Sequence, residues 1–109
     1  IITDSWYDYE SKYNLGGSKH IVPADIPKEI YDACEDFALR AHTALGCKGI
    51  SRVDFRWDNS LGIDGLFLLE INTQPGMTPT SLSPEQAKEK GISFDSLCTW
   101  IVEDASCNR

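Results

Sequence analysis

Residues 52–72 read RVDFRWDNSLGIDGLFLLEIN, and this stretch decides the fold of the 109-residue chain. Apolar residues alternate with polar ones over 48–57 and over 69–72, the end of the apolar run 66–72, whereas the segment 58–65 is rich in Asp, Asn, Ser and Gly. Alternation of this kind predicts strands, and turn-forming residues between two strands predict an antiparallel hairpin. The chain therefore contains at least one antiparallel sheet element.

The register of this hairpin follows if its centre lies at Gly62. The expected cross-strand pairs are Arg52 with Asn72, Asp54 with Glu70, and Phe55 with Leu69. Side chains alternate between the two faces of a strand, so one face is expected to be apolar and to pack on a core. This apolar face comprises Val53, Phe55, Trp57, Phe67, Leu69 and Ile71. The other face comprises Arg52, Asp54, Glu70 and Asn72, followed by Arg56 and Leu68.

The polar face places two carboxylates, Asp54 and Glu70, directly opposite one another. Like charges in that position destabilise a sheet, and a divalent cation between them would remove the repulsion. Asp, Glu and Asn offer hard oxygen ligands, which suit Mg²⁺. A solvated polar face, on which arginine and carboxylate side chains pair, is the plainer alternative. The strand pattern alone leaves both interpretations open.

The loop that leaves the polar face, 72–78, contains Gly76. A glycine lets the backbone approach a ligand closely, and its N–H can point at a developing negative charge. Ser81 and Leu82 follow just before a predicted helix, where hydroxyl and backbone donors suit a carboxylate. An ordinary turn that leads to a helix cap explains the same residues without a ligand, so this choice also stays open.

Helical periodicity predicts three helices around the hairpin. Apolar residues recur at helical spacing over about 27–45. A short helix is expected to be capped by Ser83, with Pro84 at its first position, and to end at Gly91. A last helix is expected to be capped by Ser93. The fold class is therefore α+β, an antiparallel sheet with flanking helices.

Composition excludes some partners. A net charge of −7 argues against nucleic acid, because no basic patch is available to neutralise phosphates. No apolar stretch approaches the roughly 18 residues of a membrane span. The four cysteines form no CxxC pair, and free thiols in a reducing cytoplasm are expected. The chain begins at Ile1 without a Met, and we expect it to be part of a longer protein.

Four motifs together resemble one family. They are RxD at 52–54, LExNTxPGMTxxSL at 69–82, LGCKG at 45–49 and YDYExKY at 7–13. The first two resemble the metal and acceptor-site motif of the D-alanine–D-alanine ligases, ATP-dependent carboxylate–amine ligases of the ATP-grasp class. The resemblance covers nearly the whole chain. It implies that residues 1–109 form the C-terminal part of an ATP-grasp domain, without the N-terminal and central nucleotide-binding parts.

The resemblance implies a role for each residue of the polar face. Asp54 and Glu70 would bind one Mg²⁺, and Glu70 and Asn72 a second, with Mn²⁺ as an alternative ion. Arg52 and the Gly76 N–H would stabilise the oxyanion of a tetrahedral intermediate.

The resemblance also implies substrate contacts. Ser81 and the Leu82 N–H would hold the carboxylate of the acceptor D-alanine. Lys12 would contact the transferred phosphate of ATP, and Tyr13 would help to close a mobile loop over the site. Two looser candidates for the adenine pocket are Trp6, which stands where the family often has another aromatic residue, and Leu68, which is chosen from the polar face of the strand.

The implied activity is ligation of two D-alanines through an acyl phosphate, a step of peptidoglycan synthesis that supports cell-wall biogenesis and cell shape. The implied setting is the cytoplasm, with ATP and D-alanine as substrates. The rest of the same chain would complete the ATP-binding site, and the intact enzyme is expected to be a homodimer. The 109 residues alone are expected to be inactive. Alternatives are a ligase that makes D-alanyl-D-lactate or D-alanyl-D-serine, and a non-catalytic metal-binding interaction module.

Overall fold

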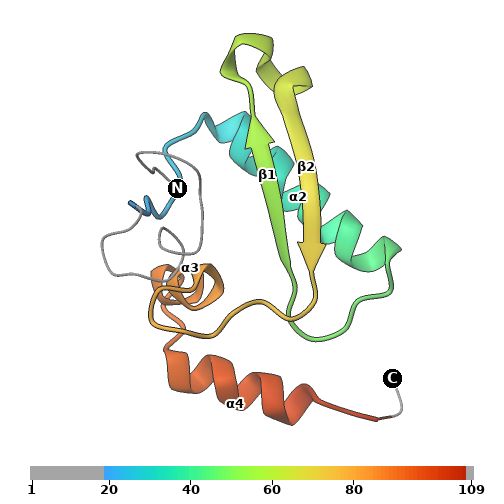
Figure 1. Ribbon diagram of the computed structural model, residues 1–109, viewed down its shortest axis with the longest axis vertical. Helices are drawn as coiled ribbons and strands as arrows, with labels where there is room; N and C mark the ends of the chain where they lie inside the picture. The colour runs from blue at the N-terminus through green and yellow to red at the C-terminus, as the bar shows by residue number, and fades with distance from the viewer. Residues whose placement is uncertain (1–18, 108–109) are drawn as a thin grey trace. The chain divides into compact units, whose positions relative to one another are not determined.

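The computed structural model describes residues 19–107, and the α+β class expected from the sequence is confirmed (Figure 1). The chain divides into two compact units. One unit contains 26–75 and 98–107, and the other contains 19–25 and 76–97. The expected extended segment at 1–13 and most of the expected loop at 14–19 lie outside the described residues.

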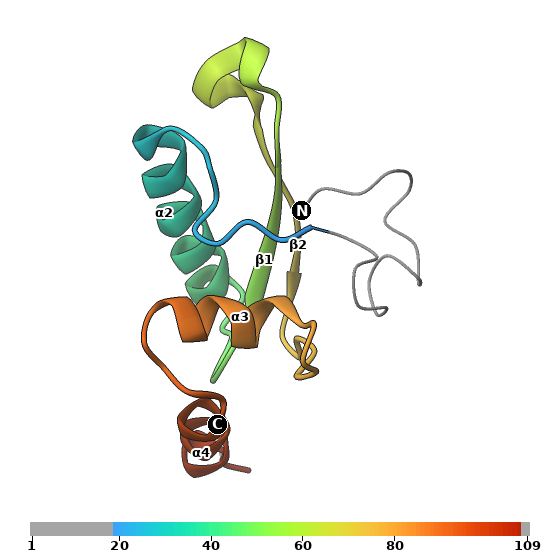
Figure 2. The same ribbon diagram turned by 90° about the vertical axis from the view of Figure 1, so that its left-hand side faces the viewer.

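The first unit is a hairpin backed by a helix. Strands β1 (Arg52–Trp57) and β2 (Leu66–Asn72) pair antiparallel, and helix α2 (Lys28–Ala44) contacts both of them. Figure 2 shows α2 lying along one side of the hairpin. Ile30 of α2 is completely buried, which places the core of this unit on the helix-facing side.

Helix α2 ends where its sequence predicts. Gly46 has a φ of 63°, a left-handed conformation that only glycine adopts readily. The Gly46 N–H donates to the carbonyl of Thr43, and the Cys47 N–H donates to the carbonyl of His42. This pair of bonds is the Schellman motif, which satisfies carbonyls left open at the helix end. The chain then turns back toward β1.

The register of the hairpin is confirmed over its first three pairs and is wrong beyond them. Arg52 lies opposite Asn72 and Asp54 opposite Glu70, but Phe55 lies opposite Leu68 rather than Leu69. Leu69 is therefore the extra residue of a β-bulge.

The bulge changes which side chains share a face. The pairing places Phe67 opposite Arg56 and Leu68 opposite Phe55. The expectation that Phe67 and Leu69 lie in the core is wrong, because their exposed fractions are 53% and 62%. The expectation that Leu68 belongs to the polar face is also wrong, since directly opposed residues share a face and Phe55 lies on the Val53 side.

The turn of the hairpin is a 3-10 segment, η1 (Asn59–Gly65), capped by Asp58. The Asp58 carboxylate accepts hydrogen bonds from the Ser60 hydroxyl at 2.7 Å and the Ser60 N–H at 3.0 Å. These two bonds lower the pKa of the Asp58 carboxyl below its ordinary value. The Trp57 indole N–H donates to the Gly62 carbonyl at 2.8 Å, which ties the end of β1 to the turn.

The second unit contains helix α3 (Leu82–Glu89) and the start of α4 (Phe94–Asp104). The cap expected at Ser83 is wrong, because α3 begins two residues earlier than expected, at Leu82, with Ser81 at the N-cap position. The cap expected at Ser93 is confirmed, since its hydroxyl accepts the Ser96 N–H at 3.1 Å. No helix within residues 19–107 combines the length and apolar character needed to cross a bilayer.

Candidate functional site

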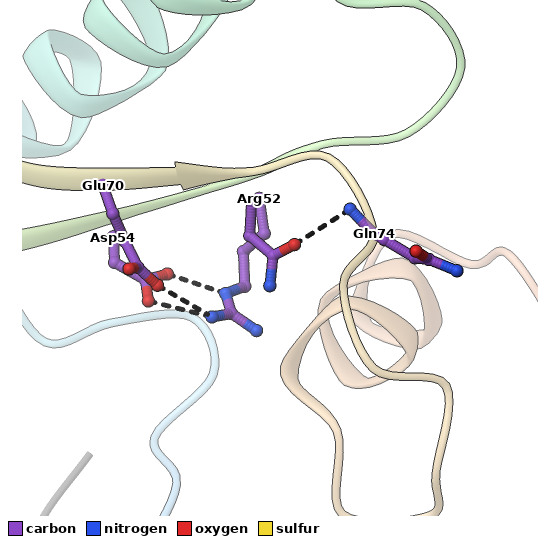
Figure 3. A network of polar contacts seen from close by, with 5 residues as sticks. Arg52, Asp54, Glu70 and Gln74 are labelled. Atoms are coloured by element: carbon purple, nitrogen blue, oxygen red, sulfur yellow. Dashed lines mark hydrogen bonds and ion pairs between the residues drawn. The ribbon is translucent and has the colours of Figure 1, made fainter.

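The polar face of the hairpin is organised around an arginine–aspartate pair. Arg52 and Asp54 stand two residues apart on β1, so both side chains point to the same face. The Arg52 Nε donates to Asp54 Oδ1 at 2.7 Å, and Nη2 donates to Oδ2 at 2.9 Å. Figure 3 shows the guanidinium aligned with the carboxylate in this two-bond arrangement. Such bidentate, charge-assisted pairs fix the orientation of both groups.

Glu70 reaches the same guanidinium from the other strand. It lies directly opposite Asp54, and its Oε1 is 3.8 Å from Arg52 Nη2 (Figure 3). One positive charge therefore stands beside two facing carboxylates and offsets their repulsion. The sequence-based prediction that these three side chains converge is confirmed. The arginine–carboxylate pairing of the plainer interpretation is present as well.

Asn72 ends β2 on this face, opposite Arg52. Its Oδ1 accepts the Gln74 backbone N–H at 2.9 Å, so the side chain starts the turn into the following loop. The hydrogen bond fixes the direction of the amide oxygen while leaving it a second lone pair. Asn72 thus belongs to the same strand face as Glu70, which lies two residues before it.

The donor set fits a hard divalent cation. Asp54, Glu70 and Asn72 offer oxygen atoms on one face of the hairpin, and each carboxylate oxygen bound by Arg52 keeps a further lone pair. Within residues 19–107, no three His, Cys, Asp or Glu side chains gather closely enough to hold a metal ion by themselves. Two carboxylates and one amide leave coordination positions for water and phosphate, which Mg²⁺ generally keeps.

In the other unit, the hydroxyl of Ser81 is held by Thr78. Ser81 Oγ accepts the Thr78 N–H at 2.9 Å and lies 2.7 Å from Thr78 Oγ1. The Ser81 N–H donates back to the Thr78 carbonyl at 3.0 Å. Ser81 makes no side-chain cap bond to helix α3. Its hydroxyl is therefore directed to the loop side of the helix N-terminus, and Leu82 is the first residue of the helix.

Gly76 lies against the same hydroxyl. A Cβ atom at position 76 would lie 2.9 Å from Ser81 Oγ, closer than real contacts allow. A side chain here would displace the Ser81 hydroxyl or the loop. Glycine is therefore needed at position 76 because the backbone lies close to the Ser81 hydroxyl of the same unit.

Sequence reasoning missed Thr78 as a partner of Ser81. The signal was present, because a Thr three residues before a Ser in a turn can share hydrogen bonds with it. Arg52, Asp54, Glu70 and Asn72 come together as expected in one unit, whereas Gly76, Ser81 and Leu82 belong to the other. Three predicted site residues lie outside the described part of the chain: Trp6, Lys12 and Tyr13.

The chain has the architecture of the C-terminal part of an ATP-grasp domain. Its hairpin has opposed carboxylates, and a glycine-containing loop and a helix follow in the sequence. Two solved structures of the D-alanine–D-alanine ligase from Bacillus anthracis are similar to this chain. One, complexed with ATP, has a TM-score of 0.65 at 31% identity and covers 74% of this chain and 27% of that chain. The other has a TM-score of 0.68 at 30% identity, and its match covers 92% of this chain and 31% of that chain.

The family described as the D-ala D-ala ligase C-terminus matches residues 1–103, and the chain belongs to this family. A D-alanine–D-alanine ligase from Jannaschia sp. (strain CCS1) is 66% identical over all 109 residues, which are 34% of its length. One from Cereibacter sphaeroides (strain ATCC 17025) is 70% identical over the same residues, 36% of its length. The chain thus spans about a third of the curated relatives that it matches.

Proposed function

We propose that this chain forms part of an ATP-dependent ligase that joins two D-alanines into D-alanyl-D-alanine for peptidoglycan synthesis. The observation that carries the proposal is the convergence of Arg52, Asp54 and Glu70 on one face of the hairpin. Two opposed carboxylates beside a fixed guanidinium suit chemistry in which negative charge moves between phosphate and carbonyl oxygens. Family membership and the likeness to an ATP-complexed ligase support the same activity.

Asp54, Glu70 and Asn72 would hold two Mg²⁺ ions, with Mn²⁺ as an alternative. Bound ions would offset the charge of the ATP phosphates during transfer to the first D-alanine carboxylate. The resemblance implies that Glu70 would help to hold both ions. Glu70 lies directly opposite Asp54 and two residues before Asn72. Arg52 would keep the carboxylates apart and oriented before metal arrives.

Arg52 would also stabilise the reaction intermediate. The amine of the second D-alanine attacks the carbonyl carbon of the acyl phosphate, and the carbonyl oxygen becomes an oxyanion. The amide forms when the C–O bond to phosphate breaks and the amine proton is lost. A guanidinium always carries its charge and can direct N–H groups at that oxygen. The Gly76 N–H would donate to the same oxyanion, a role that rests only on the resemblance of the motif at 69–82.

Ser81 and Leu82 would hold the carboxylate of the acceptor D-alanine. The support from the structure is the fixed Ser81 hydroxyl at the start of α3, where backbone donors and the helix dipole favour an anion. The remaining roles rest on the resemblance alone. They are phosphate contact by Lys12, loop closure by Tyr13 and adenine contact by Trp6. Leu68 is not proposed for the adenine pocket, because it is a candidate only as part of the polar face and the pairing with Phe55 places it on the other face. The proposal includes a cytoplasmic homodimer.

The test uses the full-length protein that carries this chain. It is assayed with Mg-ATP and D-alanine, and dipeptide and phosphate are measured together. We expect D-alanine-dependent phosphate release with one dipeptide per phosphate. D-lactate and D-serine are offered as acceptors in parallel, and preference for either would reassign the acceptor. ATP turnover without any D-alanine product would refute the proposal. The 109 residues alone should make no dipeptide.

A further inference from the structure

A histidine–glutamate pair joins two distant parts of the second unit. His20 Nδ1 lies 2.6 Å from Glu85 Oε2, and the two residues are 65 positions apart in the sequence. The His20 side chain is 13% exposed and that of Glu85 is 36% exposed, so the contact is partly withdrawn from water. The segment 19–25 is thereby attached to helix α3.

Glu85 occupies a position with electrostatic consequences. It is the acidic residue in the first turn of α3, four residues after Ser81. A carboxylate in the first turn interacts favourably with the partial positive charge of the helix N-terminus. It would therefore compete with any other anion that approaches the same end. The carboxylate of an acceptor amino acid at Ser81 and Leu82 would be such an anion.

His20 is placed to offset this competition. An ionised carboxylate can only accept hydrogen bonds, so the proton in the contact belongs to His20 Nδ1. The hydrogen bond holds the Glu85 carboxylate near His20, and the partial positive charge of the donated N–H offsets part of the negative charge of the carboxylate. The helix N-terminus is then left more favourable to a second anion.

We propose that His20 is a positioning residue for acceptor binding, which holds and offsets the Glu85 carboxylate beside the N-terminus of α3. The inference rests on the proposed function, because it takes the acceptor carboxylate to bind at Ser81 and Leu82. In this role His20 acts through Glu85. Its removal is consequently expected to affect the affinity for the second D-alanine more than the rate of the chemical step.

The experiment uses the full-length protein and three variants: His20→Ala, Glu85→Gln and the double variant. Rates are measured against D-alanine concentration, from which the Michaelis constant of the second D-alanine is separated from kcat. His20→Ala should raise that constant roughly 3- to 10-fold, because the Glu85 carboxylate, no longer paired, would compete with the acceptor for the N-terminus of α3. Glu85→Gln should stay within about twofold of wild type.

The double variant carries the decisive comparison. It has lost the same contact as His20→Ala but has no unpaired carboxylate, so its constant should return to within about twofold of wild type. The KM for ATP and kcat should change little in all three. His20→Gln, which keeps a donor, should fall between wild type and His20→Ala. Thermal melting identifies any variant that is not folded.

A matched control is Asp36→Ala, which breaks the exposed Arg40–Asp36 pair of 3.5 Å on α2 and should leave every constant unchanged. A His20→Ala variant that is folded and binds the second D-alanine normally would overturn the inference. So would a double variant as weak as His20→Ala, because that result assigns the effect to lost attachment rather than to charge. A wild-type protein that makes no dipeptide would instead overturn the proposed function.

Discussion

Replacing Arg52 by alanine in the full-length protein separates the two roles that its geometry supports. As a structural partner, Arg52 contributes two short hydrogen bonds to Asp54. Hydrogen bonds to charged groups contribute about 1.5–3 kcal/mol each when buried. The side chains here are 20% and 31% exposed, and solvent screening reduces the pair to roughly 1–2 kcal/mol in total. The expected loss of Tm is about 2–8 °C.

As an oxyanion donor, Arg52 would contribute much more. Loss of one such donor typically lowers kcat by about 10²–10³, or roughly 2.7–4 kcal/mol. The assay follows kcat at saturating ATP and D-alanine across a Mg²⁺ titration, at a temperature well below the Tm of the variant. We expect kcat to stay about 10²-fold or more below wild type at every Mg²⁺ concentration, with a smaller change in the KM for ATP.

Arg52→Lys is the matched control, because lysine keeps the charge but lacks the planar fork. It should recover part of the stability and little of kcat. If Arg52→Ala folds, binds Mg-ATP and keeps wild-type kcat, the oxyanion role is refuted. If its activity returns with excess Mg²⁺, Arg52 is a structural partner of the carboxylates only.

Three further predictions test other parts of the site and fold. Glu70→Gln should lower activity at limiting Mg²⁺ more than Asn72→Ala, because Glu70 would bridge both ions; a wild-type rate for Glu70→Gln there would contradict the metal assignment. Gly65→Ala should destabilise the protein by at least about 2 kcal/mol in chemical denaturation, because its Cβ would lie 2.1 Å from the Asp58 carbonyl oxygen. Thr78→Val should raise the KM of the second D-alanine about 2- to 10-fold, because the Ser81 hydroxyl loses its hydrogen bond to Thr78 Oγ1. Thr78→Ser keeps a hydroxyl and should not raise it. An unchanged KM for the valine variant would count against the role of the Ser81 hydroxyl.

The polar half of the hairpin was predictable because its residues tolerate only one register. A slip of one strand by one position would move its polar residues to the core face, which are Arg52 and Asp54 on β1 or Glu70 and Asn72 on β2. The bulge was not predictable, because residues 66–69 read LFLL and look equally apolar whichever side chain faces the core. The hydrophobic pattern therefore contains no information about where the extra residue lies.

The helix cap shows a different limit. Ser81 and Ser83 both satisfy the sequence preference for a cap, and only the three-dimensional structure shows that the Ser81 hydroxyl is bound to Thr78. His20 and Glu85 are 65 residues apart in the sequence, and no local sequence pattern could predict that they are in contact. The converging carboxylates follow from strand alternation, whereas the roles assigned to them follow from the resemblance.

The bulge at Leu69 has a consequence for engineering. It lies between the end of the hairpin that carries the carboxylates and the end that carries the 3-10 turn, and bulges fix the register of the strands around them. We therefore expect residues added to or removed from the 58–65 turn to change the pairing only on the turn side of Leu69. The pairs Arg52–Asn72 and Asp54–Glu70 keep their alignment. The turn is consequently a place where a peptide tag or reporter loop can be grafted without realigning the acidic face.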